Sequence, residues 1–475
     1  MNDKLNTLTI KEAREGLKAR TFSSVELTKA CLARIKAVEP KINAFVTVCE
    51  EDALREAKRA DDLASQGETL EAKPLLGIPM ALKDLFSTKG IRTTAASKVL
   101  ENYIPQFDAT VVKKLKDAGA VVIGKTNHDA WGHGASGENS DFGPTKNPWN
   151  QAYVPGGSSS GSGAAVASDM CLAATGTDTG GSSRSPANFC NVVGLKPTYG
   201  RVSRYGIIAM ASSLDSIGHL TKTVEDSALL LSVTAGSDSL DATTPNIETK
   251  EYAKNINNSV KGIKIGVDSE FFSKAIESKT LHQLKEAYNL LKNELGVEMV
   301  EVKLPHAKYA NPGYYIVQPA EVSSNLARYD GIRYGNERSS FGDEAKRRIM
   351  LGTYELSAGY YDAYYKKAMQ VRTRIINDFE EAWKSVDVII APVSPTPPWK
   401  LGEKVNDPQK MYLSDIFTVT ANLVGVPSLS IPIGFVDGLP VGMQIVGPRF
   451  SEEKLFQIGY AYEQETEWYK RKPVL

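Results

Sequence analysis

Apolar residues recur at helical spacing in the first part of the chain. Ser23 and Glu26 match the capping box that begins many helices, and apolar side chains follow at Val25, Leu27, Cys31, Leu32 and Ile35. A second amphipathic run extends from Ala53 to Leu63. This periodicity predicts helices across residues 1–70.

Near residue 76 the pattern changes to short apolar runs that Gly and Pro interrupt. We interpret four of them as strands: Leu76–Leu82, Ala120–Ile123, Val192–Leu195 and Ile207–Ala211. Helical stretches at 110–118 and 224–234 separate these runs. Strands that alternate with helices favour an α/β fold, in which a sheet lies between helical layers.

The alternation continues beyond a polar stretch, 238–262, that is either a domain boundary or a surface excursion. The predicted elements are a strand at 263–267, a helix at 281–295, a strand at 297–302, a Tyr-rich helical region at 312–384, and strands at 386–392 and 429–432. The length of 475 residues leaves one to three domains open, because large α/β enzymes often form one unit.

Gly and Ser dominate residues 145–206. A linker of that composition would be flexible, but this segment also contains a small-residue helical run at 163–168 and the strand predicted at 192–195. We therefore interpret it as tightly packed backbone around a functional site, where small residues let loops approach closely.

Composition and charge exclude several classes of protein. A hydrophobic content of 42% with 24% charged residues excludes a disordered chain. The 56 basic and 56 acidic residues give no net charge, so no overall field would hold the protein on nucleic acid or an anionic membrane. The N-terminus lacks the apolar core of a signal peptide, and no apolar run has the length of a membrane span. We expect a cytoplasmic protein.

Neither the cysteines nor the histidines form a metal-binding pattern. The four cysteines (Cys31, Cys49, Cys171 and Cys190) have no CxxC spacing and are too few for a disulfide scaffold. His128 and His133 are close in sequence, but no Cys or carboxylate cluster completes a zinc site around them. We expect buried free thiols and no metal.

Three segments contain candidate catalytic residues: Lys83 within Ala81–Phe86, the loop Gly156–Gly163, and Gly176–Pro186. The first loop contains a GxSxG match that would make Ser159 the nucleophile of an α/β-hydrolase, but the residues before it form a poor strand. No GK[ST] follows its glycines, as a phosphate-binding loop requires.

Lys83 follows an apolar strand, where burial would disfavour the protonated amine and let it act as a base. The ordinary alternative is that Lys83 ends the strand and pairs with Asp84. For Asp178–Ser182 the ordinary alternative is a plain turn.

With their surroundings, these three segments resemble the amidase signature family. The resemblance implies a Ser–cis-Ser–Lys triad in which Ser182 is the nucleophile, Ser158 the bridging serine and Lys83 the base. The residues themselves also predict an oxyanion hole from the amides of Thr179, Gly180, Gly181 and Ser182, because the glycines can turn N–H groups inward. We expect Arg184 to brace this loop. The implied fold is a large mixed β-sheet sandwiched between α-helical layers, in a single domain (1–475) with N-terminal helices at 1–70, the signature core at 71–235 and the remainder at 236–475.

Within this family, three further segments are similar to the glutamine-hydrolysing A subunits of tRNA-dependent amidotransferases: Ser323–Gly335, Glu344–Gly352 and Gly359–Lys367. That similarity implies that Arg348 grips the α-carboxylate of glutamine, Asp415 pairs with its α-ammonium and Tyr314 lines the pocket. Considered without it, Arg347 and Arg348 fit a solvated helix face and Asp415 a helix cap.

The resemblance also implies partners. Ammonia would pass to a B subunit, which uses ATP and Mg²⁺ and holds the misacylated tRNA, and a small C subunit would clasp the pair; this chain would need no cofactor of its own. Ser160, Ser183, Ser185 and Asn191 depart from the usual pattern of these subunits, and so does Asp129–His133. The departures favour an alternative, a free-standing amidase that acts on other amides, esters or carbamates; a third hypothesis is a scaffold subunit with an inactive site.

Overall fold

The computed structural model describes residues 4–272, 276–332 and 335–475. The helices of the N-terminal region are α1 (Ile10–Lys18), α2 (Ser24–Ile42) and α3 (Glu50–Ser65). Ser23 and Glu26 form the predicted capping box, with the Glu26 amide donating to Ser23 Oγ at 3.1 Å. A short strand, β1 (Phe45–Val48), separates α2 from α3 and was not predicted.

One mixed sheet of eleven strands runs through the described residues, in the order β1-β3-β2-β4-β6-β5-β10-β11-β9-β7-β8. Its strands are β2 (Pro79–Lys83), β3 (Val121–Thr126), β4 (Ala173–Asp178), β5 (Val193–Lys196), β6 (Ser216–Thr221), β7 (Lys264–Val267), β8 (Glu298–Glu301), β9 (Val388–Pro392), β10 (Ser428–Val436) and β11 (Leu439–Val446). The predicted α/β class with a large mixed sheet and covering helices is confirmed.

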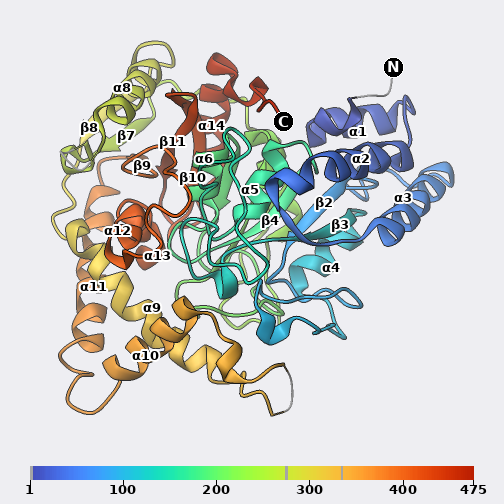
Figure 1. Ribbon diagram of the computed structural model, residues 1–475. Coiled ribbons are helices and arrows are strands. Elements are labelled where there is room, and N and C mark those ends of the chain that lie inside the picture. Colours follow the sequence, from blue (N-terminus) through green and yellow to red (C-terminus); the bar gives the residue numbers. More distant parts are fainter. Residues whose placement is uncertain (1–3, 273–275, 333–334) are drawn as a thin grey trace.

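Helices cover the sheet along its whole length (Figure 1). They are α4 (Thr110–Asp117), α5 (Ser160–Ala167), α6 (Arg184–Cys190), α7 (Val224–Thr234), α8 (Ser278–Asn293), α9 (Ala310–Leu326), α10 (Asp343–Glu355), α11 (Tyr365–Ala382), α12 (Pro408–Tyr412), α13 (Val419–Val424) and α14 (Glu452–Thr466). The predicted Tyr-rich helical region is thus divided among α9, α10 and α11, which project together at the lower left of Figure 1.

The run Ile207–Ala211 was wrongly predicted as a strand. Among the described residues, the β-type pairing of this run is limited to a single bridge, between Ile207 and Phe86. The amides of Met210 and Ala211 instead donate to the buried carboxylate of Asp215, at 3.0 and 3.1 Å. These backbone amides thus bond to a side chain and not to a neighbouring strand. The apolar pattern of the sequence does not reveal that difference.

The Gly/Ser-rich segment forms buried, closely packed backbone, as predicted. Every residue of α5 is buried. A Cβ added at Gly161 would lie 2.3 Å from the Ala44 carbonyl oxygen, and one at Gly163 would lie 3.0 Å from Pro186 at the start of α6. The small residues therefore let α5 pack directly against α6 and the strands beneath.

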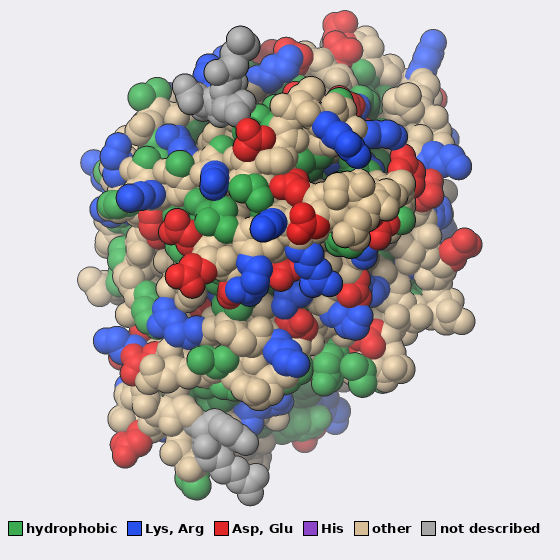
Figure 2. Space-filling view, turned by 90° about the vertical axis from the view of Figure 1, so that its right-hand side faces the viewer, with side chains coloured by type: hydrophobic (Ala, Val, Ile, Leu, Met, Phe, Trp, Pro, Cys, Tyr) green, Lys and Arg blue, Asp and Glu red, His purple; other side chains and the backbone are tan. Residues whose placement is uncertain are grey.

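Surface charge is mixed on the face that Figure 2 shows, where Lys and Arg side chains alternate with Asp and Glu. This agrees with the zero net charge of the sequence. No helix of the described residues is both long enough and apolar enough to span a membrane.

Candidate active site

Lys83 ends β2 at the edge of the sheet where β4 also ends. The two strands are parallel, with Ala81 opposite Ala174, so Lys83 lies beside the segment that leads to Ser182. Its amine is fully buried and lies within hydrogen-bond distance of three hydroxyls: Ser158 Oγ at 2.8 Å, Thr177 Oγ1 at 2.8 Å and Ser159 Oγ at 3.0 Å.

Asp84 does not pair with Lys83, which contradicts the ordinary interpretation of this lysine. Asp84 Oδ1 instead lies 3.3 Å from Lys125 Nζ, and its other oxygen accepts from the Thr94 amide at 2.8 Å. Lys83 therefore has neutral hydrogen-bonding partners and no directly paired carboxylate.

Burial lowers the pKa of Lys83 to about 7, and the more distant Asp129, Asp178 and Asp215 oppose that shift only in part. Removing a charged amine from water disfavours its protonated form. Above pH 7 a large share of Lys83 is thus a neutral amine with a free lone pair, which is what a general base needs.

Ser158 follows a cis peptide bond from Gly157, as the family resemblance implies. A Cβ added at Gly157 would lie 2.0 Å from Asp129 Oδ2, so the loop passes directly against that carboxylate. Asp129 also accepts from the amides of Gly137 and Asn139, at 3.0 Å each. This buried aspartate, which the sequence analysis named only within the departing segment Asp129–His133, holds two loops around Ser158.

Ser182 lies in the short loop between β4 and α6, and the Ser159 amide donates to its carbonyl oxygen at 3.0 Å. The structure thus brings the loops of Ser158 and Ser182 together beside Lys83. The residue before the predicted nucleophile, Gly181, has a φ of 136°. A Cβ there would also lie 2.5 Å from Thr418 Oγ1, so only glycine fits.

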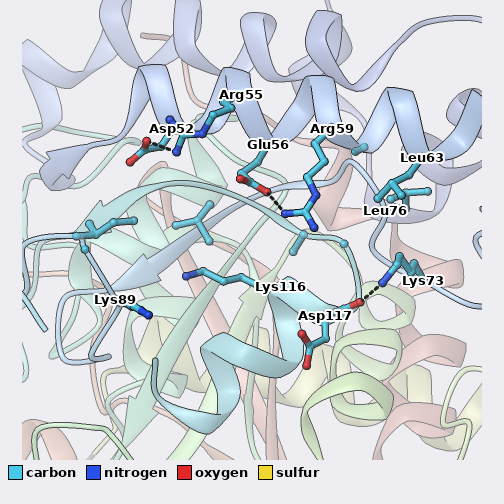
Figure 3. Close-up of a pocket in the computed structure, with 16 residues that line it drawn as sticks. Asp52, Arg55, Glu56, Arg59, Leu63, Lys73, Leu76, Lys89, Lys116 and Asp117 are labelled. Atoms are coloured by element: carbon cyan, nitrogen blue, oxygen red, sulfur yellow. Dashed lines mark hydrogen bonds and ion pairs between the residues drawn. The ribbon is translucent and has the colours of Figure 1, made fainter. Parts of the chain in front are cut away.

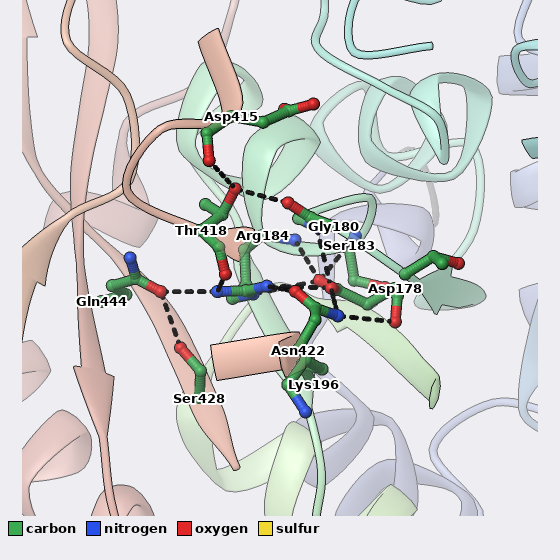
Figure 4. Close-up of polar contacts among 12 residues, drawn as sticks. Asp178, Gly180, Ser183, Arg184, Lys196, Asp415, Thr418, Asn422, Ser428 and Gln444 are labelled. Atoms are coloured by element: carbon green, nitrogen blue, oxygen red, sulfur yellow. Dashed lines mark hydrogen bonds and ion pairs between the residues drawn. The ribbon is translucent and has the colours of Figure 1, made fainter. Parts of the chain in front are cut away.

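A buried ion pair shapes the Ser182 loop (Figure 4). Arg184 Nη2 donates to Asp178 Oδ1 at 2.9 Å, and its Nε donates to Oδ2 at 3.0 Å. Arg184 also donates to Gln444 Oε1 at 2.6 Å and Asn422 Oδ1 at 2.7 Å. Burial alone would raise the pKa of Asp178, but the Arg184 guanidinium outweighs it and holds that pKa far below its usual range. Arg184 braces the loop, as predicted.

The four amides predicted as an oxyanion hole are not equivalent. The Gly181 amide donates to Asp178 Oδ1 at 2.9 Å and is therefore already occupied. Among the described residues, nothing accepts from the amides of Thr179, Gly180 and Ser182. These three remain available to an oxygen atom of a substrate.

Arg348 and Asp415 are both buried, on α10 and at the end of the short helix Leu413–Asp415. The solvated-face interpretation is therefore wrong for Arg348, whose Nε donates to Glu344 Oε1 at 2.8 Å. The helix-cap interpretation is not supported for Asp415, whose Oδ2 accepts from Tyr315 at 2.7 Å. Burial raises the pKa of Asp415 to about 7, against the lowering effects of the Tyr315 hydrogen bond and Arg348.

Aromatic rings lie next to both Arg348 and Asp415. Tyr315 and Tyr412 are stacked with centroids 3.9 Å apart, and the Arg348 guanidinium lies 5.6 and 5.7 Å from their centroids. Tyr314 lies beside the Ser182 loop, because a Cβ at Gly180 would be 2.6 Å from its hydroxyl. The predicted pocket residues thus extend from Tyr314, beside the Ser182 loop, to Arg348 on α10.

A cavity of about 430 Å³ opens on the Arg348 side of this cluster. Its lining includes Arg348, Tyr315, Tyr412, Glu344 and Gly134, but not Tyr314, Asp415 or Ser182. Sequence reasoning missed Glu344, although it precedes Arg348 by four residues, a spacing that pairs opposite charges on a helix. It also missed Tyr315, Tyr412, Thr177 and Asp129, for which no sequence signal was available.

A second cavity, of about 560 Å³, lies between α3 and the segment around Lys116 (Figure 3). It shares no lining residue with the Lys83 cluster. Its charged groups mostly satisfy one another: Arg55 pairs with Asp52, Arg59 lies 3.7 Å from Glu56, and Lys73 donates to the Asp117 carbonyl at 2.8 Å. It offers no nucleophile. Nor do the described residues contain a cluster of three or more His, Cys, Asp or Glu able to hold a metal.

A family model and two relatives with known names match nearly the whole chain. The amidase family model matches residues 26–456. Two relatives, from Desulfatibacillum aliphaticivorans and Carboxydothermus hydrogenoformans, are named as the A subunit of glutamyl-tRNA(Gln) amidotransferase. Each is 52% identical to this chain; the alignments cover 99% and 98% of this chain and 100% and 99% of the relatives.

Two solved structures also resemble this chain over nearly its whole length. The crystal structure of the same-named protein from Thermotoga maritima has a TM-score of 0.81 and 44% identity, covering 97% of this chain and 95% of its own. The native peptide amidase of Stenotrophomonas maltophilia has a TM-score of 0.84 and 31% identity, covering 98% of each chain.

Proposed function

Since the chain belongs to the amidase family, we propose that it hydrolyses glutamine as the ammonia-producing subunit of a tRNA-dependent amidotransferase. The observation that carries the chemistry is the fully buried contact between Lys83 Nζ and Ser158 Oγ, at 2.8 Å. The names of the relatives that match nearly the whole chain support glutamine as substrate.

Lys83 starts the reaction as a neutral amine. Such an amine has two N–H donors and one lone pair, so one of its three hydroxyl neighbours must donate to it; we assign this role to Ser158. Ser182 Oγ then attacks the side-chain carboxamide carbon. Its proton passes to Ser158 Oγ, and the Ser158 proton passes to Lys83.

The same relay runs in reverse to release ammonia. The amide nitrogen receives the proton and leaves, so that a glutamyl ester remains on Ser182. Water attacks the ester by the same route and yields glutamate. The amides of Thr179, Gly180 and Ser182 would stabilise the oxyanion of each step, because none has an acceptor among the described residues.

The ends of glutamine would be bound by Arg348 and Asp415. A guanidinium matches the α-carboxylate and a carboxylate matches the α-ammonium. Both side chains are buried, so their charges act with little screening. A bound ammonium would also favour the ionised form of Asp415, whose pKa is raised to about 7 by burial.

We assign the remaining steps to partner chains. A B subunit would bind the tRNA and use ATP with Mg²⁺ to activate the misacylated end, which is Glu-tRNA(Gln) and could also include Asp-tRNA(Asn). A C subunit would hold the other two chains together, in the cytoplasm. The zero net charge supports this division of roles, since nothing in it favours tRNA binding by this chain. One domain is also proposed, because the sheet contains strands from residues 45 to 446.

A free-standing amidase is the second candidate. It is favoured by the unusual residues beside the nucleophile, Ser183 and Ser185, and by the peptide amidase among the similar structures. A scaffold role is disfavoured because the Lys83–Ser158 contact is intact.

Ammonia release separates these candidates. The purified chain, alone and with B and C subunits, is assayed with glutamine and with neutral aryl amides. The proposal expects glutamine turnover that partners enhance and that Arg348→Ala reduces. Turnover of aryl amides alone, unaffected by partners or by Arg348→Ala, contradicts it.

A further inference from the structure

His133 is a buried histidine that the mechanism above does not use. It is 1% exposed, and neither ring nitrogen has a hydrogen-bond partner among the described residues. Its backbone is fixed: its amide donates to the Ala130 carbonyl at 3.0 Å, and its carbonyl accepts from Asn139 Nδ2 at 2.9 Å. The ring is therefore held in place without being satisfied.

Other buried histidines of the chain do have partners. His219 Nε2 lies 3.0 Å from the Ser227 carbonyl oxygen, and His128 Nδ1 lies 2.7 Å from the Asp129 carbonyl oxygen. A buried polar group without a partner is unfavourable, and most such groups in proteins are bonded. The two unpartnered nitrogens of the His133 ring are therefore free to bond a ligand.

The backbone segment that carries His133 runs between Ser158 and the cavity that Arg348 lines; the ring itself lies behind the lining residues Ala130 and Gly134. A Cβ on Gly132 would lie 3.7 Å from Ser158 Oγ. On the other side, Ala130 and Gly134 line the cavity that Arg348 also lines. The segment thus passes from the bridging serine to the wall of the cavity beside Arg348.

We propose that His133 is a substrate-binding residue, whose ring N–H donates to the same α-carboxylate that Arg348 binds. This inference rests on the proposed function and deepens it. A neutral imidazole has one N–H donor, and the carboxylate already paired with Arg348, that of Glu344, is not bonded to this ring; a substrate carboxylate at Arg348 would supply the acceptor. Burial, with the Arg348 charge as a second cause, keeps the pKa of His133 well below its usual range, so the ring is neutral.

Two variants and two substrates test the assignment. His133→Leu removes both ring nitrogens, and His133→Gln keeps a donor. The substrates are glutamine and 4-aminobutanamide, which is glutamine without its α-carboxylate. For His133→Leu we expect KM for glutamine to rise about tenfold with kcat nearly unchanged, as for loss of one hydrogen bond to a charged group. Kinetics with 4-aminobutanamide should not change, and His133→Gln should restore most of the affinity.

The matched control is His219→Gln, a buried histidine whose ring is bonded elsewhere; it should leave the ratio of the two KM values unchanged. Thermal unfolding provides an independent readout, because replacing an unpartnered ring with leucine should not lower Tm. Equal losses on both substrates, or an unchanged KM for glutamine in a folded His133→Leu, overturn the assignment alone. A wild-type chain that hydrolyses 4-aminobutanamide but not glutamine overturns the proposed function and the assignment together.

Discussion

Lys83 Nζ lies 2.8 Å from Ser158 Oγ, and neither residue has exposed surface. The contact joins the end of β2 to the loop before α5, two segments 75 residues apart in sequence. Its chemistry depends on whether the Lys83 amine is protonated. Burial favours the neutral amine by lowering the pKa of Lys83 to about 7.

The pH profile of glutamine hydrolysis should therefore follow the titration of Lys83. Protonated Lys83 cannot accept the Ser158 proton, so kcat should rise with pH, with an apparent pKa near 7. The measurement is initial ammonia release between pH 5.5 and 9 at saturating glutamine, where the ionisation of Asp415 affects KM and not kcat. A rate independent of pH across this window would contradict the base assignment.

Lys83→Met should abolish activity and yet stabilise the fold. The folded-state pKa of Lys83 lies below its unfolded value of 10.5. Between pH 10.5 and 7, the lysine is therefore protonated in the unfolded chain but neutral in the folded chain, and lowering the pH favours the unfolded state. That difference costs stability near pH 7, on the order of a few kcal/mol. Urea unfolding at pH 7 should show a higher midpoint for Lys83→Met, and the gain should shrink at pH 10. A lower midpoint at both pH values would show that the amine stabilises the fold.

Serine variants separate the nucleophile from its neighbours. Ser182→Ala should reduce kcat by about 10⁴-fold or more, since Ser182 Oγ forms the ester in the proposed mechanism. Ser159→Ala removes one of three hydroxyls around Lys83 and should cost no more than about tenfold. The reverse order would support Ser159 as the nucleophile of a GxSxG motif. Labelling with a serine-reactive amide analogue, followed by peptide mapping, identifies the acylated residue directly.

Some of this site could be predicted from sequence, and the reasons differ by residue. Lys83 and the two serines stand in short segments whose order along the chain is distinctive, so a resemblance identifies them. Glu344 precedes Arg348 by one helical turn and could have been found by charge spacing. Asp129 and Tyr315 contact Gly157 and Asp415 only through tertiary packing, which no local pattern encodes.

The elements of the fold also differ in how far the sequence predicts them. Amphipathic helices and apolar strands such as β9 were predicted because their periodicity is local. β4 was missed because its Ala, Gly and Thr residues, all buried, resemble a loop in sequence. Small side chains are needed there because α5 packs directly on that strand.

Tyr315→Phe should weaken glutamine binding in a pH-dependent way. The Tyr315 hydroxyl donates to Asp415 at 2.7 Å and lowers the pKa of that carboxyl against the larger effect of burial. Without it the pKa rises further, so at pH 7 less Asp415 is ionised to bind the α-ammonium. We expect KM to increase about tenfold at pH 7 and to recover towards pH 8.5, as the carboxyl ionises.

Two comparisons control this prediction. Glutaramate, which is glutamine without its α-amino group, should show no change in KM for Tyr315→Phe. Tyr309→Phe, at an exposed tyrosine just before α9, should leave glutamine binding unchanged. A KM increase shared by glutaramate would mean that the ring acts by packing and not through Asp415.

Gly157→Ala tests the close approach that positions Ser158. The added methyl would lie 2.0 Å from Asp129 Oδ2 and 2.9 Å from the amide nitrogens of Ser136 and Gly137. Two of these three neighbours are backbone, so the loops must separate, and Asp129 would lose part of its contact with Gly137. We expect a loss of about 1–3 kcal/mol in the free energy of unfolding together with a large fall in kcat. Gly313→Ala is the matched control. Gly313 lies inside α9, and its Cβ would meet only Val371 of α11, at 3.8 Å. This substitution should stabilise the protein by about 0.5–1 kcal/mol. If Gly157→Ala keeps wild-type kcat and stability, the Asp129 loop does not position the bridging serine.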